Sequence, residues 1–228
     1  MVVNRSRGES EGASRLSENE FARDITVLID KLVEALGADV RVRLLKVRDK
    51  LLELHQRGIV KINHSVMEVI CAGHMARLGY EVDVERYLGD FLVCDVYGEK
   101  GGGTHIIEVE TGFAPPEAAL DPQRYLRARV VSKVARYSKY ADKFSLATPR
   151  YNIIEIPETL LKPPRLRQLG EIEALKKLCD IYYSRPPIQV EELVNCRIHS
   201  IVILNIDELG MTEYSPENYY EKILKHVW

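Results

Sequence analysis

The chain has 228 residues, of which 46% are hydrophobic and 29% are charged, and its formal net charge at pH 7 is -2. This length and apolar content indicate one large folded domain, or one domain with an appendage, and exclude wholesale disorder. The chain is not positively charged overall, so its net charge does not indicate a nucleic-acid partner. Any basic surface must be local.

Cysteine spacing and hydropathy limit the class of protein further. The four cysteines form no Cys-x-x-Cys pair; they are Cys71, Cys94, Cys179 and Cys196. This spacing argues against a zinc or iron–sulfur cluster and is typical of reduced, buried thiols. No apolar run approaches the roughly 20 residues of a membrane span, and the polar N-terminus lacks a signal-peptide hydrophobic region. We therefore expect a cytoplasmic protein with no membrane partner.

The N-terminal part divides into a tail and a helical hairpin. Residues 1–16 are rich in Ser, Gly, Arg and Glu and are expected to form a disordered tail. Residues 17–60 contain apolar residues at helical spacing on both sides of Gly37, which predicts two helices, the second from about Asp39 to His55. We expect this hairpin either to contact substrate or to form a homodimer.

A row of basic residues follows the second helix of the hairpin. Arg43, Lys46 and Lys50 lie along one side of it, with Glu53 interrupting the row. One interpretation is an ordinary solvated helix face. The other is a ridge that contacts the phosphates of a nucleic acid.

Residues 61–228 have the composition of an α/β domain. A third helix is expected over about Ser65 to Leu78 and a long helix over 121–142. Strands are predicted near 80–87, 91–97, 104–110 and 143–148. The C-terminal part is expected to contain a short strand over 151–156, a helix over 167–183, a strand over 198–206 and a helix over 215–227. This order predicts a mixed sheet covered by helices.

Three carboxylates interrupt two of the apolar strands. Asp95 lies within Phe91–Tyr97, and Glu108 and Glu110 lie within the next strand. Alternate residues of a strand share a face, so the two glutamates point the same way, and a glycine-containing hairpin can place Asp95 beside them. An ionised carboxylate is costly to bury unless it is paired or coordinates a metal. The pattern therefore predicts an acidic cleft that attracts a divalent cation.

The order of these acids resembles a known family. Glu68 lies in the third helix, Val93-Cys94-Asp95 in the second strand of the domain, and Glu108-Val109-Glu110 in the third. Together they resemble the PD-(D/E)xK nuclease superfamily, in particular archaeal Holliday-junction resolvases and RecB-like exonuclease domains. The resemblance covers about residues 63–148 and implies a restriction-endonuclease-like core of the order α-β-β-β-α-β.

This resemblance implies an activity and a metal. Asp95, Glu108 and the Val109 carbonyl would bind Mg²⁺ or Mn²⁺, and Glu68 would hold a second metal through water. The implied reaction is hydrolysis of phosphodiester bonds in nucleic acid, DNA in preference to RNA, by a metal-activated water.

The chain departs from the family pattern at the last position of Glu-x-Lys, where it carries Glu110. Lys133, four residues before Tyr137, stands where some members carry Gln-x-x-x-Tyr, and either replaces the missing lysine or is a surface residue beside Arg129 and Arg136. Glu110 or Lys133 would orient or deprotonate the attacking water. Arg129, Arg136 and Tyr137 are candidate nucleic-acid contacts.

Other interpretations of the same residues remain open. Ser65 and Glu68 have the spacing of a helix-capping box, and Glu110 can pair with Lys133 in a buried salt bridge. The protein would then be a catalytically inactive member of the fold that binds nucleic acid or a partner protein, or an unrelated α/β protein with a salt-bridge network. Three histidines near these elements are expected to be structural rather than metal ligands, namely His64, His74 and His105.

Overall fold

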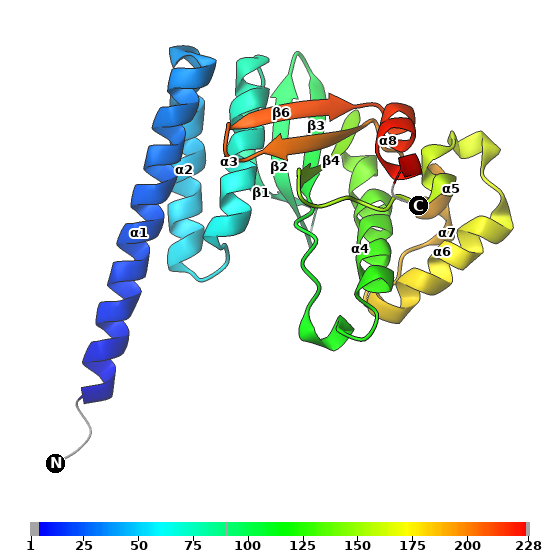
Figure 1. Cartoon of the computed structure of the whole chain (residues 1–228), viewed down its shortest axis with the longest axis horizontal. Helices are drawn as coiled ribbons and strands as arrows, with labels where there is room; N and C mark the ends of the chain where they lie inside the picture. Colours follow the sequence, from blue (N-terminus) through cyan, green and yellow to red (C-terminus); the bar gives the residue numbers. More distant parts are fainter. Residues whose placement is uncertain (1–4, 90, 227–228) are drawn as a thin grey trace.

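The computed structural model describes the backbone of residues 5–89 and 91–226, and within these ranges the side chains from residue 19 onward. The fold is α/β, with a six-stranded mixed open sheet in the order β1-β2-β3-β4-β5-β6 and helices on both faces (Figure 1).

Three helices form the N-terminal layer, drawn in blue to cyan in Figure 1. They are α1 (Arg5–Leu36), α2 (Arg41–Gln56) and α3 (Ile62–Arg77), with a 3₁₀ turn at Ala38–Val40 between the first two. The expected helical hairpin is present, but α1 begins within the segment expected to be a disordered tail. Adding residues to an existing helix is much easier than nucleating one, so α1 can continue through this polar stretch. Residues 1–4 of the expected tail lie outside the described residues.

The sheet combines antiparallel and parallel pairs. β1 (Glu81–Leu88), β2 (Leu92–Lys100) and β3 (Gly103–Val109) form an antiparallel meander. β4 (Lys143–Pro149) is parallel to β3, and β5 (Ser200–Asn205) is parallel to β4. β6 (Gly210–Tyr214) is antiparallel to β5. The four strands predicted between residues 80 and 148 therefore share one sheet, and the predicted pairing of 91–97 with 104–110 is confirmed.

The second helical layer contains α4 (Pro122–Tyr137) and most of the C-terminal part. Asp121 caps α4 by accepting a hydrogen bond of 3.2 Å from the Arg124 amide, and Pro122 occupies the first helical position. The other helices are α5 (Glu158–Leu161), α6 (Leu169–Tyr182), α7 (Val190–Asn195) and α8 (Pro216–Lys222). Short 3₁₀ turns lie at Pro116–Ala118, Ser138–Tyr140, Pro164–Leu166 and Leu224–His226.

Two hydrophobic layers hold these elements on the sheet. One joins α1, α2 and α3 to a sheet face that carries Val84, Val96 and Ile107. The other joins α4, α6, α7 and α8 to the opposite face, through residues such as Ile106 and Phe144. The hairpin of α1 and α2 therefore shares its core with the sheet.

Two features of the C-terminal part differ from expectation. The strand predicted over 151–156 is wrong, because the backbone amide of Ile154 donates to the Tyr219 hydroxyl (2.9 Å), which donates back to the Ile154 carbonyl (3.1 Å). β5 takes the place beside β4 instead. β6 was not expected, since it is short and largely exposed. Within the described residues, none of the helices has both the length and the apolar composition required to cross a membrane.

Candidate active site

The candidate site lies where β2 and β3 stop pairing. Regular pairing ends at Val96 and Ile107, and the next residues in register are Asp95 and Glu108. The Asp95 amide donates to Oε1 of Glu108 (3.1 Å), and the Val109 amide donates to Oδ2 of Asp95 (2.6 Å). Carboxylates thus take the place of backbone carbonyls as acceptors at this end of the ladder, which fixes both acids between the two helical layers.

Lys133 reaches this position from α4. Its Nζ lies 3.1 Å from Oδ2 of Asp95, 3.2 Å from Oε2 of Glu108 and 3.2 Å from Oε1 of Glu110. It also donates a hydrogen bond of 2.8 Å to the Val109 carbonyl. The side chain is only 19% exposed, so Lys133 is not an ordinary surface lysine. The contact expected from the sequence between this amine and the acids is present.

Arg129 holds Glu110 from the same helix. Its Nε and Nη2 lie 2.8 and 2.6 Å from Oε2 of Glu110, and its Nη1 donates to the Phe113 carbonyl (2.7 Å). Glu110 is buried, and two cations neutralise its carboxylate. The interpretation of Glu110 and Lys133 as a buried salt bridge is therefore correct, with Arg129 as an additional partner.

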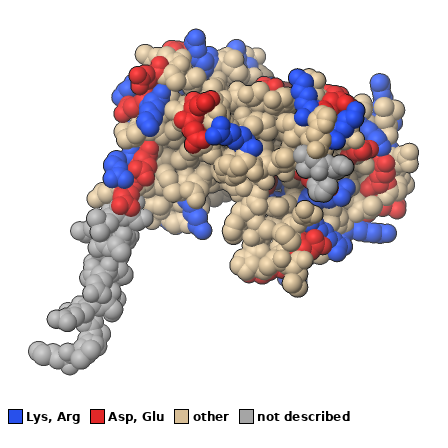
Figure 2. Space-filling view, in the orientation of Figure 1, with Lys and Arg blue, Asp and Glu red and all other residues tan. Residues whose placement is uncertain are grey.

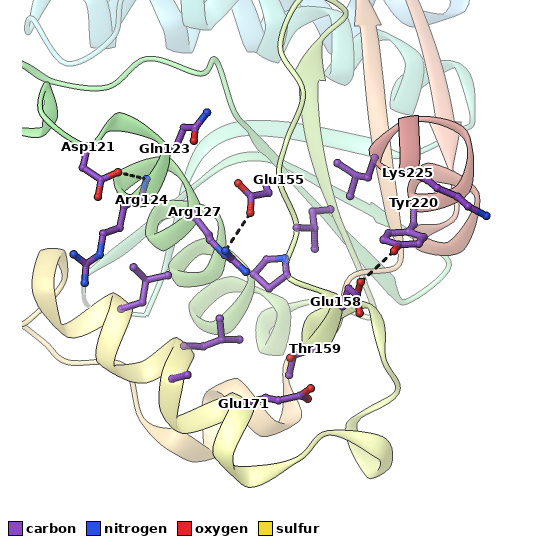
Figure 3. A pocket seen from close by; sticks show the side chains of 16 residues that line it. Asp121, Gln123, Arg124, Arg127, Glu155, Glu158, Thr159, Glu171, Tyr220 and Lys225 are labelled. Carbon is purple, nitrogen blue, oxygen red and sulfur yellow. Dashed lines mark hydrogen bonds and ion pairs between the residues drawn. The ribbon is translucent and has the colours of Figure 1, made fainter. Parts of the chain in front are cut away.

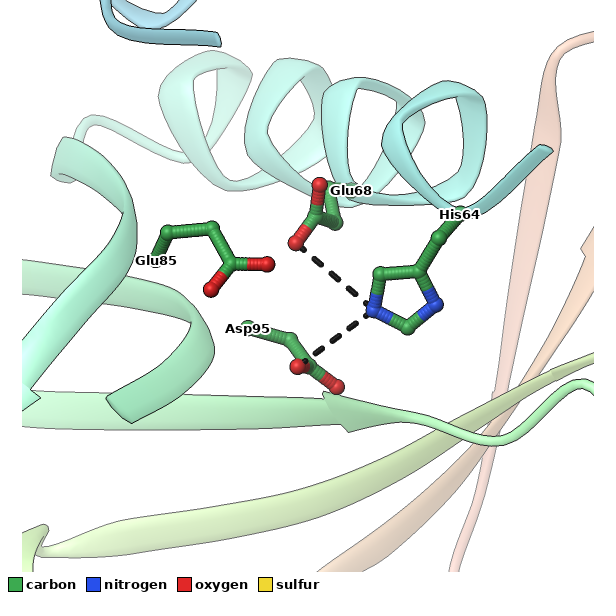
Figure 4. A group of neighbouring side chains, drawn as sticks. All are labelled: His64, Glu68, Glu85 and Asp95. Carbon is green, nitrogen blue, oxygen red and sulfur yellow. Dashed lines mark ion pairs between the residues drawn. The ribbon is translucent and has the colours of Figure 1, made fainter. Parts of the chain in front are cut away.

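A second group of side chains lies on the other side of Asp95 (Figure 4). His64, Glu68, Glu85 and Asp95 each offer one ligand atom, and these atoms all lie within 4.8 Å of one another. Nε2 of His64 is 3.4 Å from Oδ1 of Asp95 and 3.7 Å from Oε1 of Glu68. Asp95 thus belongs to both groups, with one oxygen toward Lys133 and the other toward His64.

Glu85 and Glu68 enter this group for different structural reasons. The register of β1 on β2 places Glu85 opposite Asp95, and Glu85 has a left-handed backbone conformation with φ of 47°. α3 begins at Ile62, so Glu68 lies inside the helix and is not part of a cap. Glu68 is fully buried, and neither of its carboxylate oxygens has a hydrogen-bond partner among the described residues. An unsatisfied buried carboxylate is costly, so Glu68 is a candidate cation ligand.

Burial and charge determine the protonation of the acids. Burial raises the pKa of Glu68, and repulsion from Asp95 raises it further. Burial also raises the pKa of Glu108, again with Asp95 adding to the effect. For Asp95, burial opposes ionisation, but Lys133 and His64 outweigh it and hold the pKa below its ordinary value. Asp95 is therefore the ionised centre of the cluster.

The same balance fixes the charge of Lys133. Burial alone would lower the pKa of its amine, but Asp95, Glu108 and Glu110 raise it well above the ordinary value. Lys133 is consequently protonated at neutral pH and can donate hydrogen bonds or stabilise negative charge. It is not available to accept a proton from water.

The structure divides the predicted metal ligands between the two groups. Asp95 and Glu68 lie in the group with His64 and Glu85, whereas Glu108 and the Val109 carbonyl contact Lys133. Sequence reasoning missed Glu85 and expected His64 to be structural, whereas its ring lies in this group. The spacing of His64 and Glu68, four residues apart on a helix, was a usable signal because such residues share a helix face.

The candidate phosphate-binding residues of α2 are mostly paired. Arg43 lies 2.7 Å from Glu81, and Lys50 lies 2.8 Å from Asp83, both on β1. Lys46 is exposed. On the face drawn in Figure 2, basic and acidic side chains of the described residues are interspersed over the helices. A nucleic acid on this ridge would have to displace Glu81 and Asp83.

Of the nucleic-acid candidates on α4, Arg129 and Tyr137 lie close to the acids. Arg129 holds Glu110, as described above. Arg136 donates to the Pro186 carbonyl (2.5 Å), and its guanidinium carbon lies 5.7 Å from the centre of the Tyr183 ring. Tyr137 is half-buried, and burial, reinforced by the nearby Glu108, raises its pKa. Arg129, Lys133 and Arg136 therefore share one flank of the helix at the site.

A separate pocket of about 1030 Å³ lies between α4, α6 and the C-terminal turn (Figure 3). Figure 3 shows two contacts between side chains that line it. Arg127 lies 3.2 Å from Glu155, and the Tyr220 hydroxyl donates to Glu158 (3.1 Å). None of the acids around Asp95 lines it. The acidic cluster, rather than this pocket, is the candidate active site.

No protein-family model matches the chain, and no curated protein or solved structure shows a significant match to it. The case for a function therefore depends on the geometry and chemistry of the site.

Proposed function

We propose that the chain is a metal-dependent nuclease of the PD-(D/E)xK type, with a restriction-endonuclease-like core, that hydrolyses phosphodiester bonds in DNA in preference to RNA. The element order α3-β1-β2-β3-α4-β4 supports the proposal, as does the convergence of acids from α3, β2 and β3. The observation that carries it is the pair formed by Asp95, held ionised beside Lys133, and Glu68, which is buried and has no hydrogen-bond partner among the described residues.

The residues around Asp95 fit a divalent cation. His64, Glu68, Glu85 and Asp95 would hold Mn²⁺ or Mg²⁺, because carboxylate oxygens suit both ions. The imidazole favours Mn²⁺, since nitrogen ligands suit transition metals better than Mg²⁺. When bound, such a cation lowers the pKa of a coordinated water and neutralises charge on the scissile phosphate.

The chain's own cations would assist at the phosphate. Lys133 is held by four oxygen atoms and remains protonated, so it would stabilise negative charge that develops on the phosphate or donate a hydrogen bond to the attacking water. Arg129 fixes Glu110, and Glu110 in turn helps fix Lys133. Glu110 thus acts as a positioning residue, and the lysine missing from β3 is supplied by α4.

A second candidate function is nucleic-acid or partner-protein binding without catalysis. The observation in its favour is that Lys133 already contacts Asp95, Glu108 and the Val109 carbonyl, which are the metal ligands expected on β2 and β3. An ammonium group there would take the place of a metal ion.

The test is incubation of the full chain with single-stranded, double-stranded and branched DNA and RNA, in the presence of Mn²⁺, Mg²⁺ or EDTA. The proposal predicts cleavage that requires the divalent ion and disappears in Asp95→Asn. Binding without cleavage by the wild-type chain would support the inactive alternative. If the wild-type chain neither binds nor cleaves any of these nucleic acids, the nuclease proposal and the nucleic-acid-binding alternative are both overturned.

A further inference from the structure

The loop that follows β3 carries an exposed aromatic side chain next to the site. Phe113 is 65% exposed, and it follows Glu110 by three residues. Single exposed apolar side chains are common on protein surfaces, so exposure alone does not distinguish Phe113; its place beside the acids and the anchoring of its backbone do.

The backbone that carries Phe113 is firmly anchored. Arg129 donates to the Phe113 carbonyl with one nitrogen while its other nitrogens hold Glu110, so a single guanidinium connects this loop to the acids. The Thr148 hydroxyl donates to the Glu110 carbonyl (2.9 Å), and Asn152 donates to that hydroxyl (2.8 Å). Gly112 packs so closely on Asn152 that any Cβ there would clash with the amide, and its φ of 76° favours glycine.

The hydrogen bonds of this loop hold the backbone of Phe113 in place, so its exposed ring projects from an ordered segment. A ring on an ordered backbone loses little further conformational freedom when a ligand stacks on it, so more of the contact energy appears as affinity. Aromatic rings on fixed backbone beside cationic side chains are the usual elements of surfaces that bind single-stranded nucleic acid.

Of the neighbouring basic side chains, Arg129 and Lys133 are held by the acids, which leaves Arg136 to contact a phosphate. Arg129, Lys133 and Arg136 follow one flank of α4 over about 10 Å, given a rise of about 1.5 Å per residue. Arg136 has no carboxylate partner among the described residues; its recorded contacts are the Pro186 carbonyl and the Tyr183 ring. A single strand of nucleic acid that runs with its phosphates along this flank would bring a base to the loop that carries Phe113.

We infer that Phe113 stacks on an unpaired base beside the cleaved phosphate, and that the preferred substrate is single-stranded or locally unpaired at the site. This inference rests on the proposed function and names its substrate class. A paired base inside a duplex offers no free face to Phe113, because its neighbours already cover both faces.

The test measures the binding of fluorescent oligonucleotides by fluorescence anisotropy. Ca²⁺ replaces Mn²⁺ in this measurement so that binding is observed without cleavage. Phe113→Ala should weaken binding of a single strand by about tenfold, the low to middle range for loss of one base–aromatic stack, and leave duplex binding unchanged. Leu166→Ala is the control, because Leu166 is a large apolar residue, 60% exposed, in the 3₁₀ turn Pro164–Leu166. It should bind like the wild type.

A second variant reports stacking directly. In a Trp228→Phe background, the Phe113→Trp variant should keep single-strand affinity, and the fluorescence of the introduced tryptophan should be quenched by a single strand but not by the same strand with abasic sites. Unchanged single-strand binding by Phe113→Ala, or equal quenching by the abasic strand, would overturn the inference. Metal-dependent cleavage by the wild type would then leave the proposed function intact, whereas absence of any nucleic-acid binding or cleavage would remove the proposed function itself.

Discussion

Nζ of Lys133 on α4 lies 3.2 Å from Oε1 of Glu110, the residue that directly follows β3. A carboxylate at that position adds negative charge to a cluster that already contains Asp95 and Glu108. The compensating cation comes from a different element, and Arg129 adds a second one. Under the proposed function, Lys133 on α4 supplies the positive charge that the nuclease pattern would place at position 110.

Lys133→Met should abolish cleavage and destabilise the fold. The change leaves three buried carboxylates without their shared cation, which we expect to lower the free energy of unfolding by about 3–5 kcal/mol. Urea unfolding in EDTA measures this loss, and added Mn²⁺ should recover part of it by replacing the ammonium. Lys139→Met is the control, because Lys139 is 50% exposed and pairs with Glu192, so its loss should change stability by less than about 0.5 kcal/mol. Full cleavage by Lys133→Met would mean that Lys133 is not needed, and that Glu110, alone or with Arg136, orients the attacking water.

Glu68→Gln should stabilise the metal-free chain and remove its response to metal. The buried carboxylate has no hydrogen-bond partner among the described residues, so a neutral amide of the same shape should raise the free energy of unfolding by about 1–2 kcal/mol at pH 7. Mn²⁺ should stabilise the wild type but not this variant, as measured by thermal unfolding with and without the ion. A variant that is less stable in EDTA and equally stabilised by Mn²⁺ would contradict the assignment of Glu68 as a ligand.

The arrangement of secondary structure followed from the sequence where apolar runs were long. The strands and helices between α3 and β4 were all predicted, because their apolar periods and glycine or proline boundaries are clear. The segment 151–156 was misjudged because its apolar residues pack in the second layer while its backbone bonds to the Tyr219 hydroxyl, a contact 65 residues away that no local pattern encodes.

The site was also predictable only in part, because some of its residues stand out in the local sequence and others do not. Asp95, Glu108 and Lys133 were found because charged residues in apolar strands, or on a helix beside them, are conspicuous. Glu85 was missed because its place opposite Asp95 depends on the β1–β2 register and on an unusual backbone conformation. His64 joins the group only because α3 presents it and Glu68 toward Asp95.

Gly98→Ala should destabilise the sheet without affecting the site. A Cβ at this position in β2 would overlap the terminal methyl of Met75 and lie 3.1 Å from Cδ1 of Tyr80. The methionine end can move, but the Tyr80 ring is less free, so we expect a loss of about 1–3 kcal/mol in urea unfolding. Gly170→Ala in α6 is the matched comparison, because nothing lies within 4 Å of its Cβ, and it should gain about 0.5–1 kcal/mol. Equal stabilities of the two variants would show that β2 and α3 are less closely packed than described.

His105 should make the fold sensitive to acid. Burial, reinforced by Lys143, lowers the pKa of His105 to about 4, and its Nε2 lies 2.8 Å from the Ser145 hydroxyl. The unfolded chain binds this proton near pH 6.5, so protons favour unfolding, and stability should rise with pH between about 4 and 6.5 by roughly 2–3 kcal/mol from this residue. Urea unfolding at several pH values should show this contribution in the wild type and not in His105→Gln. Identical slopes for the wild type and His105→Gln would contradict the prediction.

The central claim is that the group around Asp95 holds a divalent cation, and calorimetric titration of Mn²⁺ into the full chain tests it most directly. The account predicts saturable binding to the wild type, with loss of the binding heat in Asp95→Asn and in Glu68→Gln. The matched variant Asp142→Asn changes a carboxylate that bonds to Thr104, at the opposite end of β3, and should bind like the wild type. Absence of binding by the wild type, or equal binding by Asp95→Asn, would contradict the account.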